Sequence, residues 1–287
     1  ISSFSSRFFN DIQYKHKNNS IVKNSLDTIK LRNEINFYKN IPSKLKVYFP
    51  ILLNQDNQEK DFLELEYLPL PNLAEIFLFR KIKPNLWENI VKSLFNIFSE
   101  FYLNSKSKKI LCNASHLYSE KLNQRTNIFL DLMVNSNNVL LKKIINNGIK
   151  VNNNILPSLK ITNNKLQKEL KEIEKKRTLS FGHGDLCFNN ILIEPLSGCI
   201  KLIDPRADSL GNNKIGYVDP FYDIAKLNHS FRCFYDSIVN NMFSIIFING
   251  QYKLNIFKPY NYEIANFYFQ KIFLDKLIDK KLLRIIT

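Results

Sequence analysis

The first 147 residues of the chain contain no glycine, and this limits how the N-terminal half can bind a phosphate group. A Rossmann fold needs a glycine-rich turn before its first helix, and a Walker A loop needs two glycines beside the phosphates. Neither kind of nucleotide site can lie in this half of the chain. Three of the seven glycines fall between residues 182 and 198, which predicts tight backbone turns in that segment.

The composition is that of an ordinary globular protein. Of the 287 residues, 45% are hydrophobic and 23% are charged, which suits one large domain or two lobes. The best candidate for a membrane span, residues 242–248, is too short, and residues 1–10 lack the basic and then apolar pattern of a secretory signal. None of the four cysteines has C-x-x-C spacing. These features predict a cytoplasmic protein with reduced thiols and no membrane span.

The net charge is strongly positive: 41 lysines and arginines and 26 acidic residues give 41 − 26 = +15. The basic residues are dispersed along the chain and form no dense block. Two interpretations stay open, namely lysines spread over solvated surfaces and attraction of an anionic partner such as a nucleotide. The dispersion disfavours a nucleic-acid partner, and the sequence leaves the oligomeric state open.

Short strands and one helix are expected in the N-terminal part. Strands are predicted at residues 8–15 and 19–23, followed by a helix at 26–38 with Leu26, Ile29, Ile35 and Tyr38 on one face, and by strands at 47–53 and 62–67. Pro69 and Pro71 then break the chain, which indicates a hinge after a small β-rich unit.

The remainder of the chain is predicted to be mainly helical. Helical spacing of apolar residues is found at 86–103, 115–133, 165–177, 223–248 and 260–286. Asparagine-rich loops are expected at 135–138 and 152–154. The overall prediction is an α+β chain with no internal repeat.

The segment from 180 to 206 departs from this helical character. Asp185 is followed five residues later by Asn190, then by the apolar run 191–193, a turn, and a second apolar run that ends in Asp204. Two short runs joined by a turn predict a hairpin, in which the first strand begins beside the end of the second. We therefore expect Asn190 and Asp204 to converge, with Asp185 on the loop before them.

Two oxygen ligands beside a free carboxylate suit the transfer of a phosphoryl group. Mg²⁺ prefers a few protein oxygens together with nucleotide phosphates. A nearby carboxylate can orient an incoming hydroxyl group and accept its proton. The segment thus predicts a phosphotransferase centre.

The same residues resemble a known family. The pattern H-G-D-x-x-x-x-N at residues 183–190, followed by I-D at 203–204, resembles the catalytic loop of the aminoglycoside phosphotransferase and choline kinase family. The later D-P-F-Y-D-I-A at 219–225 is similar to that family's D-P-x-Y-D-L-A element. The resemblance implies a two-lobed, protein-kinase-like α+β fold, with a small N-terminal antiparallel β lobe containing one helix and a larger, mainly helical C-terminal lobe.

The resemblance also implies roles for the residues of this segment, with ATP and Mg²⁺ as cofactors. Asp185 is then the catalytic base, and Asn190 and Asp204 are the magnesium ligands. His183 would hold the loop without transferring protons. Asp223 would cap a helix and brace the catalytic loop.

In such a fold the nucleotide lies in the N-terminal lobe, here residues 1–68, while residues 69–287 form the helical lobe with the catalytic loop and the metal-site hairpin. The fold needs a strand lysine on the phosphates, paired with a helix glutamate. Lys23 and Glu34 fit this requirement, with Lys15 and Lys30 as alternatives for the lysine.

Two further nucleotide contacts follow from the resemblance. Backbone groups from Glu66 to Leu68 would meet the adenine. Ser5 and Ser6 stand where the family has its glycine-rich loop, and serine hydroxyls with backbone amides can bind phosphate.

A looser resemblance concerns the acceptor. Residues 6–10, 34–42, 65–68 and 203–206 look like segments of phosphotransferases found among bacterial capsule and surface-polysaccharide genes. This implies a small hydroxylated metabolite or sugar as substrate.

Three basic residues are candidate substrate contacts. Arg206 either meets an anionic substrate or pairs with Asp208 or Asp223. Lys121 and Arg125 lie one turn apart on the predicted helix at 115–133, and the alternative for both is a solvated helix face. Cys187 lies inside the catalytic loop and is interpreted as a packing residue.

Two classes of function follow. The first is a small-molecule kinase acting on an alcohol group, and the second is a catalytically inactive kinase-like module that binds a nucleotide, a nucleic acid or a protein. Retention of Asp185, Asn190 and Asp204 together favours the kinase. A protein kinase is disfavoured because H-G-D replaces H-R-D and no D-F-G or A-P-E segment follows.

Overall fold

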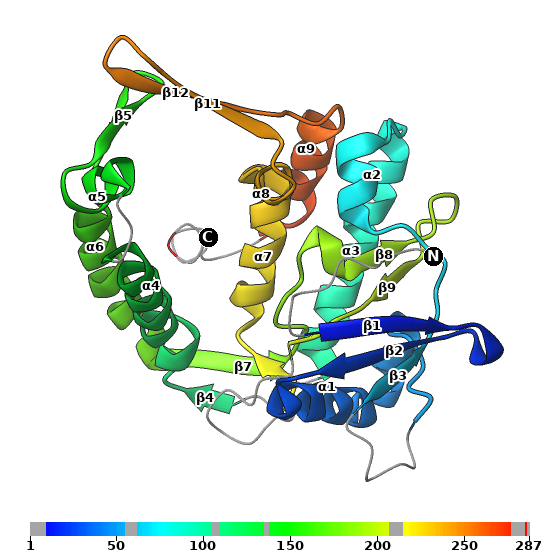
Figure 1. Ribbon diagram of the computed structural model, residues 1–287. Coiled ribbons are helices and arrows are strands. Elements are labelled where there is room, and N and C mark those ends of the chain that lie inside the picture. Colours follow the sequence, from blue (N-terminus) through cyan, green and yellow to red (C-terminus); the bar gives the residue numbers. More distant parts are fainter. Residues whose placement is uncertain are drawn as a thin grey trace.

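The computed structural model describes residues 10–54, 62–104, 110–134, 138–206, 215–276 and 285. Ser5 and Ser6, the expected phosphate-binding serines, lie outside these residues, as does Asp208. The described part combines a small antiparallel sheet with a larger, mainly helical part (Figure 1). This confirms the predicted α+β fold class.

A three-stranded antiparallel sheet opens the chain, in the order β1-β2-β3. The strands are β1 (Asn10–Lys15), β2 (Ser20–Ser25) and β3 (Leu63–Glu66). Asn19 ends the turn between β1 and β2 with a φ of 46°, a left-handed conformation that asparagine tolerates better than most residues. The strands expected at 8–15, 19–23 and 62–67 are therefore present, with residues 8 and 9 outside the described part of the chain.

Helix α1 (Thr28–Asn40) follows β2, and its buried face differs from the predicted one. The side chain of Asp27 caps the helix by accepting a hydrogen bond from the Lys30 amide at 3.1 Å, so Leu26 lies before the helix. Leu26 and Ile29 are 84% and 73% exposed. The helix buries Leu31, Glu34, Phe37 and Tyr38. Of the predicted face, Tyr38 is buried and Ile35 packs against the core, whereas Leu26 and Ile29 lie outside the buried face.

The strand expected at residues 47–53 is absent from the described structure. The chain there forms a 3₁₀ helix (Ser43–Tyr48) and contributes one isolated bridge, between Leu52 and Leu65. Pro42 precedes this segment and Pro50 interrupts it, and proline has no N–H group to donate to a strand ladder.

The helical part is centred on long apolar helices that share one core with the N-terminal sheet (Figure 1). These helices are α2 (Leu73–Phe79), α3 (Pro84–Asn104), α7 (Pro220–Arg232) and α9 (Tyr262–Ile272). The short helix α8 (Tyr235–Val239) follows α7 and buries Asp236 and Ser237. Trp87 and Phe231 are fully buried within this core. Phe37 of α1 stacks on Phe181 at 5.2 Å between ring centroids, which ties the two parts together.

A second group of elements lies to one side of this core (Figure 1). Its sheet has the order β10-β7-β4, and three helices follow one another beside it. The elements are β4 (Ile110–Cys112), α4 (Ser119–Val134), α5 (Val139–Asn146), α6 (Leu159–Ile173), β7 (Arg177–Phe181) and β10 (Tyr217–Val218). Helix α6 starts earlier than the predicted 165–177 because Ser158 caps it by accepting from the Ile161 amide.

The continuous helix predicted at 223–248 is wrong in its second half. Two helices, α7 and α8, are followed by a hairpin of β11 (Phe243–Ile248) and β12 (Gln251–Ile256). Asn249 and Gly250 form its turn with φ angles of 48° and 74°, and an Asn-Gly pair is a strong hairpin signal. The isoleucines of β11 also favour a strand over a helix.

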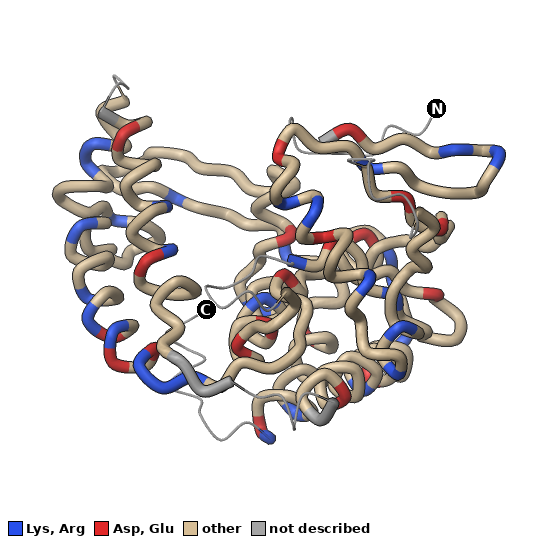
Figure 2. Tube along the Cα trace, turned by 90° about the horizontal axis from the view of Figure 1, so that it is seen from below, with Lys and Arg blue, Asp and Glu red and all other residues tan. Residues whose placement is uncertain are grey.

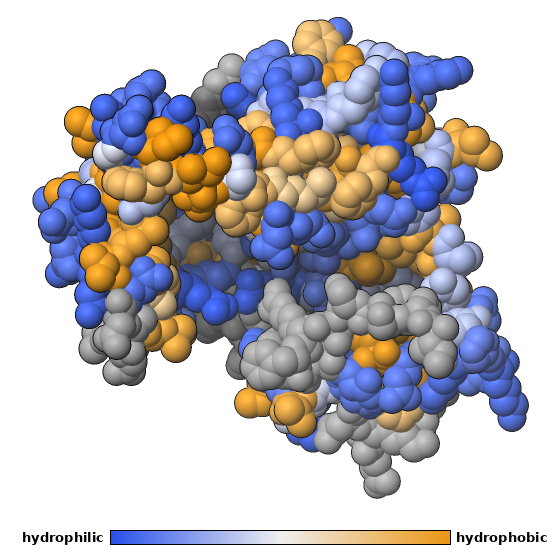
Figure 3. Space-filling view, turned by 45° about the horizontal axis from the view of Figure 1, so that its top comes forward, coloured by the Kyte–Doolittle hydropathy of each residue, from blue (hydrophilic) through white to orange (hydrophobic). Residues whose placement is uncertain are grey.

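This hairpin continues into a four-stranded sheet with β5 (Ile149–Val151) and β6 (Asn154–Leu156), in the order β11-β12-β5-β6. Figure 1 shows it arching from α8 to the group of α5 and α6. All of the residues of β11 are exposed, and Figure 3 shows hydrophobic side chains gathered in a band across the face viewed. Of the loop expected at 152–154, Asn152 and Asn153 form the turn between β5 and β6, and Asn154 already begins β6.

The charged residues are distributed over the described part of the molecule without a dense basic block. Figure 2 shows Lys and Arg scattered along the trace among Asp and Glu, as the dispersed sequence pattern predicts. Within the described ranges, no helix has the length and apolarity needed to cross a membrane. After α9 a short 3₁₀ helix (Leu274–Lys276) is described, and most of the remaining predicted helix to 286 lies outside the described residues.

Candidate active site

A short hairpin brings Asn190 and Asp204 side by side. Its strands are β8 (Ile191–Ile193) and β9 (Ile200–Leu202), with Ile191 opposite Leu202 and Ile193 opposite Ile200. The amide of Ile203 donates to the carbonyl of Asn190 at 3.0 Å, which closes the open end of the hairpin. The two expected metal ligands therefore flank the same end, as the spacing of the segment predicts.

Asp223 holds the loop before this hairpin in place. It is a buried residue in the first turn of α7. Its carboxylate accepts hydrogen bonds from the amides of His183 at 2.8 Å and Gly184 at 2.7 Å. Burial raises the pKa of Asp223 to about 7, although the two amide donors oppose the rise. The helix cap itself is Asp219, which accepts from the Phe221 amide, so the expectation that Asp223 caps a helix is wrong.

Two glycines permit this close approach of loop and helix. A Cβ on Gly182 would lie 2.8 Å from the Asp223 carboxylate and would clash with the side chain of Val218. Gly184 has a φ of 79°, and a Cβ there would meet the carbonyl oxygen of Arg206 at 2.9 Å. The cluster of glycines in the sequence thus reflects the crowded backbone of this loop.

His183 is a buried scaffold residue in this structure. The amide of Asp185 donates to its Nδ1 at 3.2 Å, and its Nε2 donates to the carbonyl of Ile203 at 3.0 Å. These partners define the neutral tautomer with hydrogen on Nε2. Burial also lowers the pKa of His183, which favours the neutral ring. The imidazole therefore joins the catalytic loop to the end of the hairpin.

Asp185 faces a lysine that sequence reasoning missed. Its carboxylate lies 2.9 Å from Nζ of Lys226. Burial is the largest single effect and acts to raise the pKa of Asp185. The charge and hydrogen bond of Lys226, with smaller contributions from His183 and Arg206, together outweigh it, so the pKa is lowered overall. The signal was present in the sequence, since Lys226 lies three residues after Asp223 and so shares its face of α7. The side-chain amide of Asn190 donates to the Asp185 carbonyl at 2.8 Å, which completes the loop.

Lys23 lies between two carboxylates drawn from distant parts of the chain. Its Nζ is 2.7 Å from Glu34 of α1 and 2.6 Å from Asp204 after β9. Burial alone would lower the pKa of Lys23, but the two carboxylates outweigh this effect and raise it. Burial raises the pKa of Glu34 to about 7, against the opposing charge of Lys23.

The alternative lysines lie elsewhere. Lys15 lies over the ring of Phe62 at 5.2 Å, and Lys30 pairs with Asp27 at 2.6 Å. The structure therefore brings Lys23, and neither alternative, to Glu34. Asp204 holds its carboxylate there with a φ of 53°, a left-handed conformation that costs about 1–3 kcal/mol for a residue other than glycine.

The expected adenine-contacting segment follows β3. The amide of Glu66 donates to Ile51 at 3.0 Å and that of Tyr67 to Asn19 at 3.0 Å, so both are already bonded within the chain. The carbonyl of Leu68 accepts from the amide of Leu70 at 2.8 Å. The backbone of this segment is therefore held by hydrogen bonds to two other parts of the chain, at Ile51 and at Asn19.

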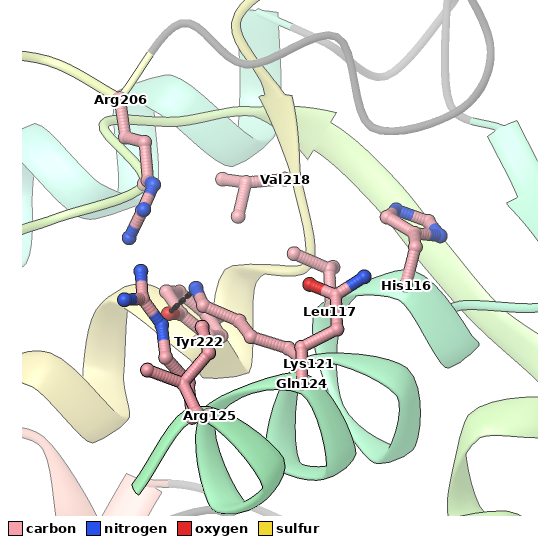
Figure 4. A pocket seen from close by; sticks show the side chains of 10 residues that line it. His116, Leu117, Lys121, Gln124, Arg125, Arg206, Val218 and Tyr222 are labelled. Carbon is pink, nitrogen blue, oxygen red and sulfur yellow. Dashed lines mark hydrogen bonds between the residues drawn. The ribbon is translucent and has the colours of Figure 1, made fainter. Parts of the chain in front are cut away.

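A pocket of about 320 Å³ adjoins the catalytic loop on the side of α4 (Figure 4). The three basic residues expected to contact substrate, Lys121, Arg125 and Arg206, all line it. Lys121 donates to the hydroxyl of Tyr222 and lies 4.6 Å from the centre of that ring. The remaining lining residues are His116, Leu117, Gln124, Ile128, Gly184 and Val218.

Cys187 lies within the catalytic loop and is buried, as expected of a packing residue. Burial raises the pKa of its thiol to about 12. The thiol is therefore protonated at neutral pH and a poor nucleophile.

Several solved structures are similar to this chain, whereas no family model and no curated protein matches its sequence. A crystal structure of an aminoglycoside-3'-phosphotransferase of type VIII is 15% identical, covers 93% of this chain and 82% of its own, and has a TM-score of 0.51. An aminoglycoside phosphotransferase from Streptomyces rimosus ATCC10970 is 13% identical, covers 96% and 90%, and has a TM-score of 0.49.

A glucosamine kinase solved with glucosamine, ADP and inorganic phosphate is 12% identical, with a TM-score of 0.49. The match covers 93% of this chain and 61% of the glucosamine kinase, so this chain spans less than two thirds of that protein. The first likeness shows the fold: this chain has the kinase-like fold of the aminoglycoside phosphotransferases, as the sequence motifs predict.

Proposed function

We propose that the protein is an ATP-dependent phosphotransferase that moves the γ-phosphate to a hydroxyl group of a small molecule. The observation that supports this most strongly is the cluster of Lys23, Glu34 and Asp204, which lies at the end of the hairpin that also positions Asn190 and the Asp185 loop. Phosphoryl transfer requires cations on the phosphates and a carboxylate at the attacking hydroxyl. The described residues supply both kinds of group.

The fixed lysine suits the α- and β-phosphates of a nucleotide. Glu34 is 10% exposed and Lys23 is 14% exposed, so their ion pair holds the ammonium group with little freedom. Lys23 would exchange part of its contact with Asp204 for phosphate oxygens. Glu34 would keep the amine in position during that exchange.

Asn190 and Asp204 would hold Mg²⁺, and their chemistry fits this ion. Asn190 donates through its nitrogen to the Asp185 carbonyl, which leaves its side-chain oxygen as a ligand, and the Asp204 side chain is 51% exposed. Mg²⁺ commonly takes one or two protein oxygens and completes its coordination with phosphates and water. When bound, it neutralises charge on the transferring phosphoryl group.

Asp185 would orient the acceptor hydroxyl and take its proton. As the acceptor oxygen bonds to the γ-phosphorus, the bond from that phosphorus to the ADP oxygen breaks, and the hydroxyl proton passes to the carboxylate. The lowered pKa of Asp185 keeps it ionised at neutral pH and makes it a weak base. Its larger contribution is then orientation, which suits a loose transition state in which little charge builds up on the attacking oxygen.

The proposal also assigns a role to each lobe and a chemical class to the acceptor. Residues 1–68 would bind the nucleotide and residues 69–287 would bind the acceptor and supply the catalytic loop. The capsule-type sequence resemblance favours a sugar or related metabolite of surface-polysaccharide synthesis as the acceptor.

The test is a phosphoryl-transfer assay with purified protein, Mg²⁺ and radiolabelled ATP, offered pools of sugars, sugar phosphates and amino alcohols. Asp185→Asn is expected to slow transfer by about 10²–10⁴-fold while leaving Mg²⁺-dependent ATP binding intact. Asp131→Asn, on the exposed side of α4, is the matched control and should transfer at the normal rate. Labelled product from no pool, together with no Mg²⁺-dependent nucleotide binding, refutes the kinase assignment.

A further inference from the structure

We infer that the acceptor is an anion: a small hydroxylated molecule whose phosphate or carboxylate group binds Lys121, Arg125 and Arg206 in the pocket beside the catalytic loop. This inference rests on the proposed phosphotransferase function and specifies its substrate class.

Like charges from separate elements converge in this pocket. Lys121 and Arg125 come from α4, and Arg206 comes from the segment that leaves the metal-site hairpin. Figure 4 shows the ends of these three side chains directed toward the same part of the pocket. Among the described lining residues, none is acidic. An anion placed there would attract all three cations and offset their mutual repulsion.

The electrostatics of Lys121 agree with this arrangement. Burial is the largest cause that lowers its pKa, and the charges of Arg206 and Lys226 add to the effect. Its ammonium group donates a hydrogen bond to the hydroxyl of Tyr222. A lysine that is partly buried among other cations gains more from a bound anion than an exposed surface lysine does.

The pocket also lies where an acceptor must lie. Gly184, next to Asp185, is part of its wall, and the Arg206 amide donates to the His183 carbonyl at 2.8 Å. Every lining residue falls between positions 116 and 222, so none belongs to the sheet that holds Lys23. The cations are therefore on the acceptor side of Asp185, which lets an anionic group sit among them while a hydroxyl faces the carboxylate.

Size and wall chemistry favour a compact acceptor with an apolar face. A volume of about 320 Å³ is at the lower end for small-molecule sites. Leu117, Ile128 and Val218 provide apolar contacts suited to the carbon skeleton of a single ring. A polycationic acceptor would meet three positive charges and no carboxylate among the described lining residues.

The test compares four hexoses of similar shape and different charge: glucose, glucosamine, glucuronate and glucose 6-phosphate. Calorimetric titration at constant ionic strength is expected to show at least about 10-fold tighter binding of one or both anions than of glucose or glucosamine. Comparing glucuronate with glucose 6-phosphate separates a carboxylate site from a phosphate site. Equal affinity for all four, or preference for glucosamine, overturns the inference.

Variants connect that preference to the pocket. Arg125→Gln is expected to reduce the preference for the anion by about 10-fold, and Arg125→Lys should retain part of it. Arg80→Gln, at the end of α2 and 57% exposed, is the matched control and should keep the full preference. An anion preference that survives Arg125→Gln unchanged contradicts the assignment.

Failure of this inference is distinguishable from failure of the proposed function. If Mg²⁺-ATP binds and phosphate passes to a neutral or cationic acceptor irrespective of Arg125→Gln, the anion site is refuted and the kinase stands. If the hexose anions bind in an Arg125-dependent way but neither Mg²⁺-ATP binding nor transfer occurs, the anion site stands and the kinase is refuted.

Discussion

The ion pair between Lys23 and Glu34 allows a quantitative test of the geometry of the proposed nucleotide site. Lys23→Met leaves Glu34 without its cation at 10% exposure, and removing one partner of a buried pair costs about 3–5 kcal/mol of unfolding free energy. Asp204 is 51% exposed, so its loss of Lys23 adds little. We expect a loss at the lower end of that range, about 3 kcal/mol.

The double mutant separates a specific pair from general packing. Glu34→Leu leaves Lys23 with Asp204, so its cost should be smaller, about 1–2 kcal/mol. Adding Glu34→Leu to Lys23→Met removes the unpaired carboxylate, and the double mutant should be no less stable than Lys23→Met alone. The coupling energy would then be about 2 kcal/mol.

Urea unfolding followed by the fluorescence of Trp87, the only tryptophan and fully buried, measures these values. The pair of Lys92 and Glu88 on the surface of α3 is the control and should show no measurable coupling. Additivity of the Lys23→Met and Glu34→Leu effects would refute the reasoning.

The same variant should change the pH dependence of stability. Burial raises the pKa of Glu34 above its unfolded value of 4.5, and losing Lys23 raises it further. The folded state then binds the proton more tightly than the unfolded state, so stability falls as pH rises through the folded pKa. Lys23→Met should therefore lose less stability relative to the wild type near about pH 5 than near about pH 8.

Two more predictions concern the catalytic loop. Gly184→Ala should lower the unfolding free energy by about 2 kcal/mol or more, because its Cβ would meet the main chain at 2.9 Å, whereas Gly250→Ala, at a similar φ but with nothing within 4 Å, should cost only about 1 kcal/mol. Equal losses of unfolding free energy in urea would show that the crowding is unimportant. Because burial raises the pKa of the Cys187 thiol to about 12, iodoacetamide should modify it far more slowly than the exposed Cys199 at neutral pH, as read by peptide mass spectrometry. Comparable rates would contradict the buried position of the loop.

Prediction from the sequence succeeded where the decisive contacts are local. The hairpin of residues 191–202 follows from two apolar runs and a glycine turn, and Gly198 has the expected left-handed φ of 74°. The pairing of Lys23 in β2 with Glu34 in the following helix α1 was also anticipated. Prediction from the sequence failed at residues 243–248, where an apolar run was assigned to a helix although the Asn-Gly turn indicated a hairpin.

The sequence by itself determined which polar groups converge at the proposed centre, because Asp185, Asn190 and Asp204 are linked through a short loop and a hairpin whose geometry leaves few alternatives. Only the tertiary structure decided which cations meet these groups. Lys23 reaches Asp204 across 181 positions, and Lys226 reaches Asp185 from a helix that a buried Asp219 caps. Arg125 and Arg206 share a pocket because α4 packs beside the loop. Contacts over such separations depend on how the common core orients whole elements, and no local pattern of residues encodes that orientation.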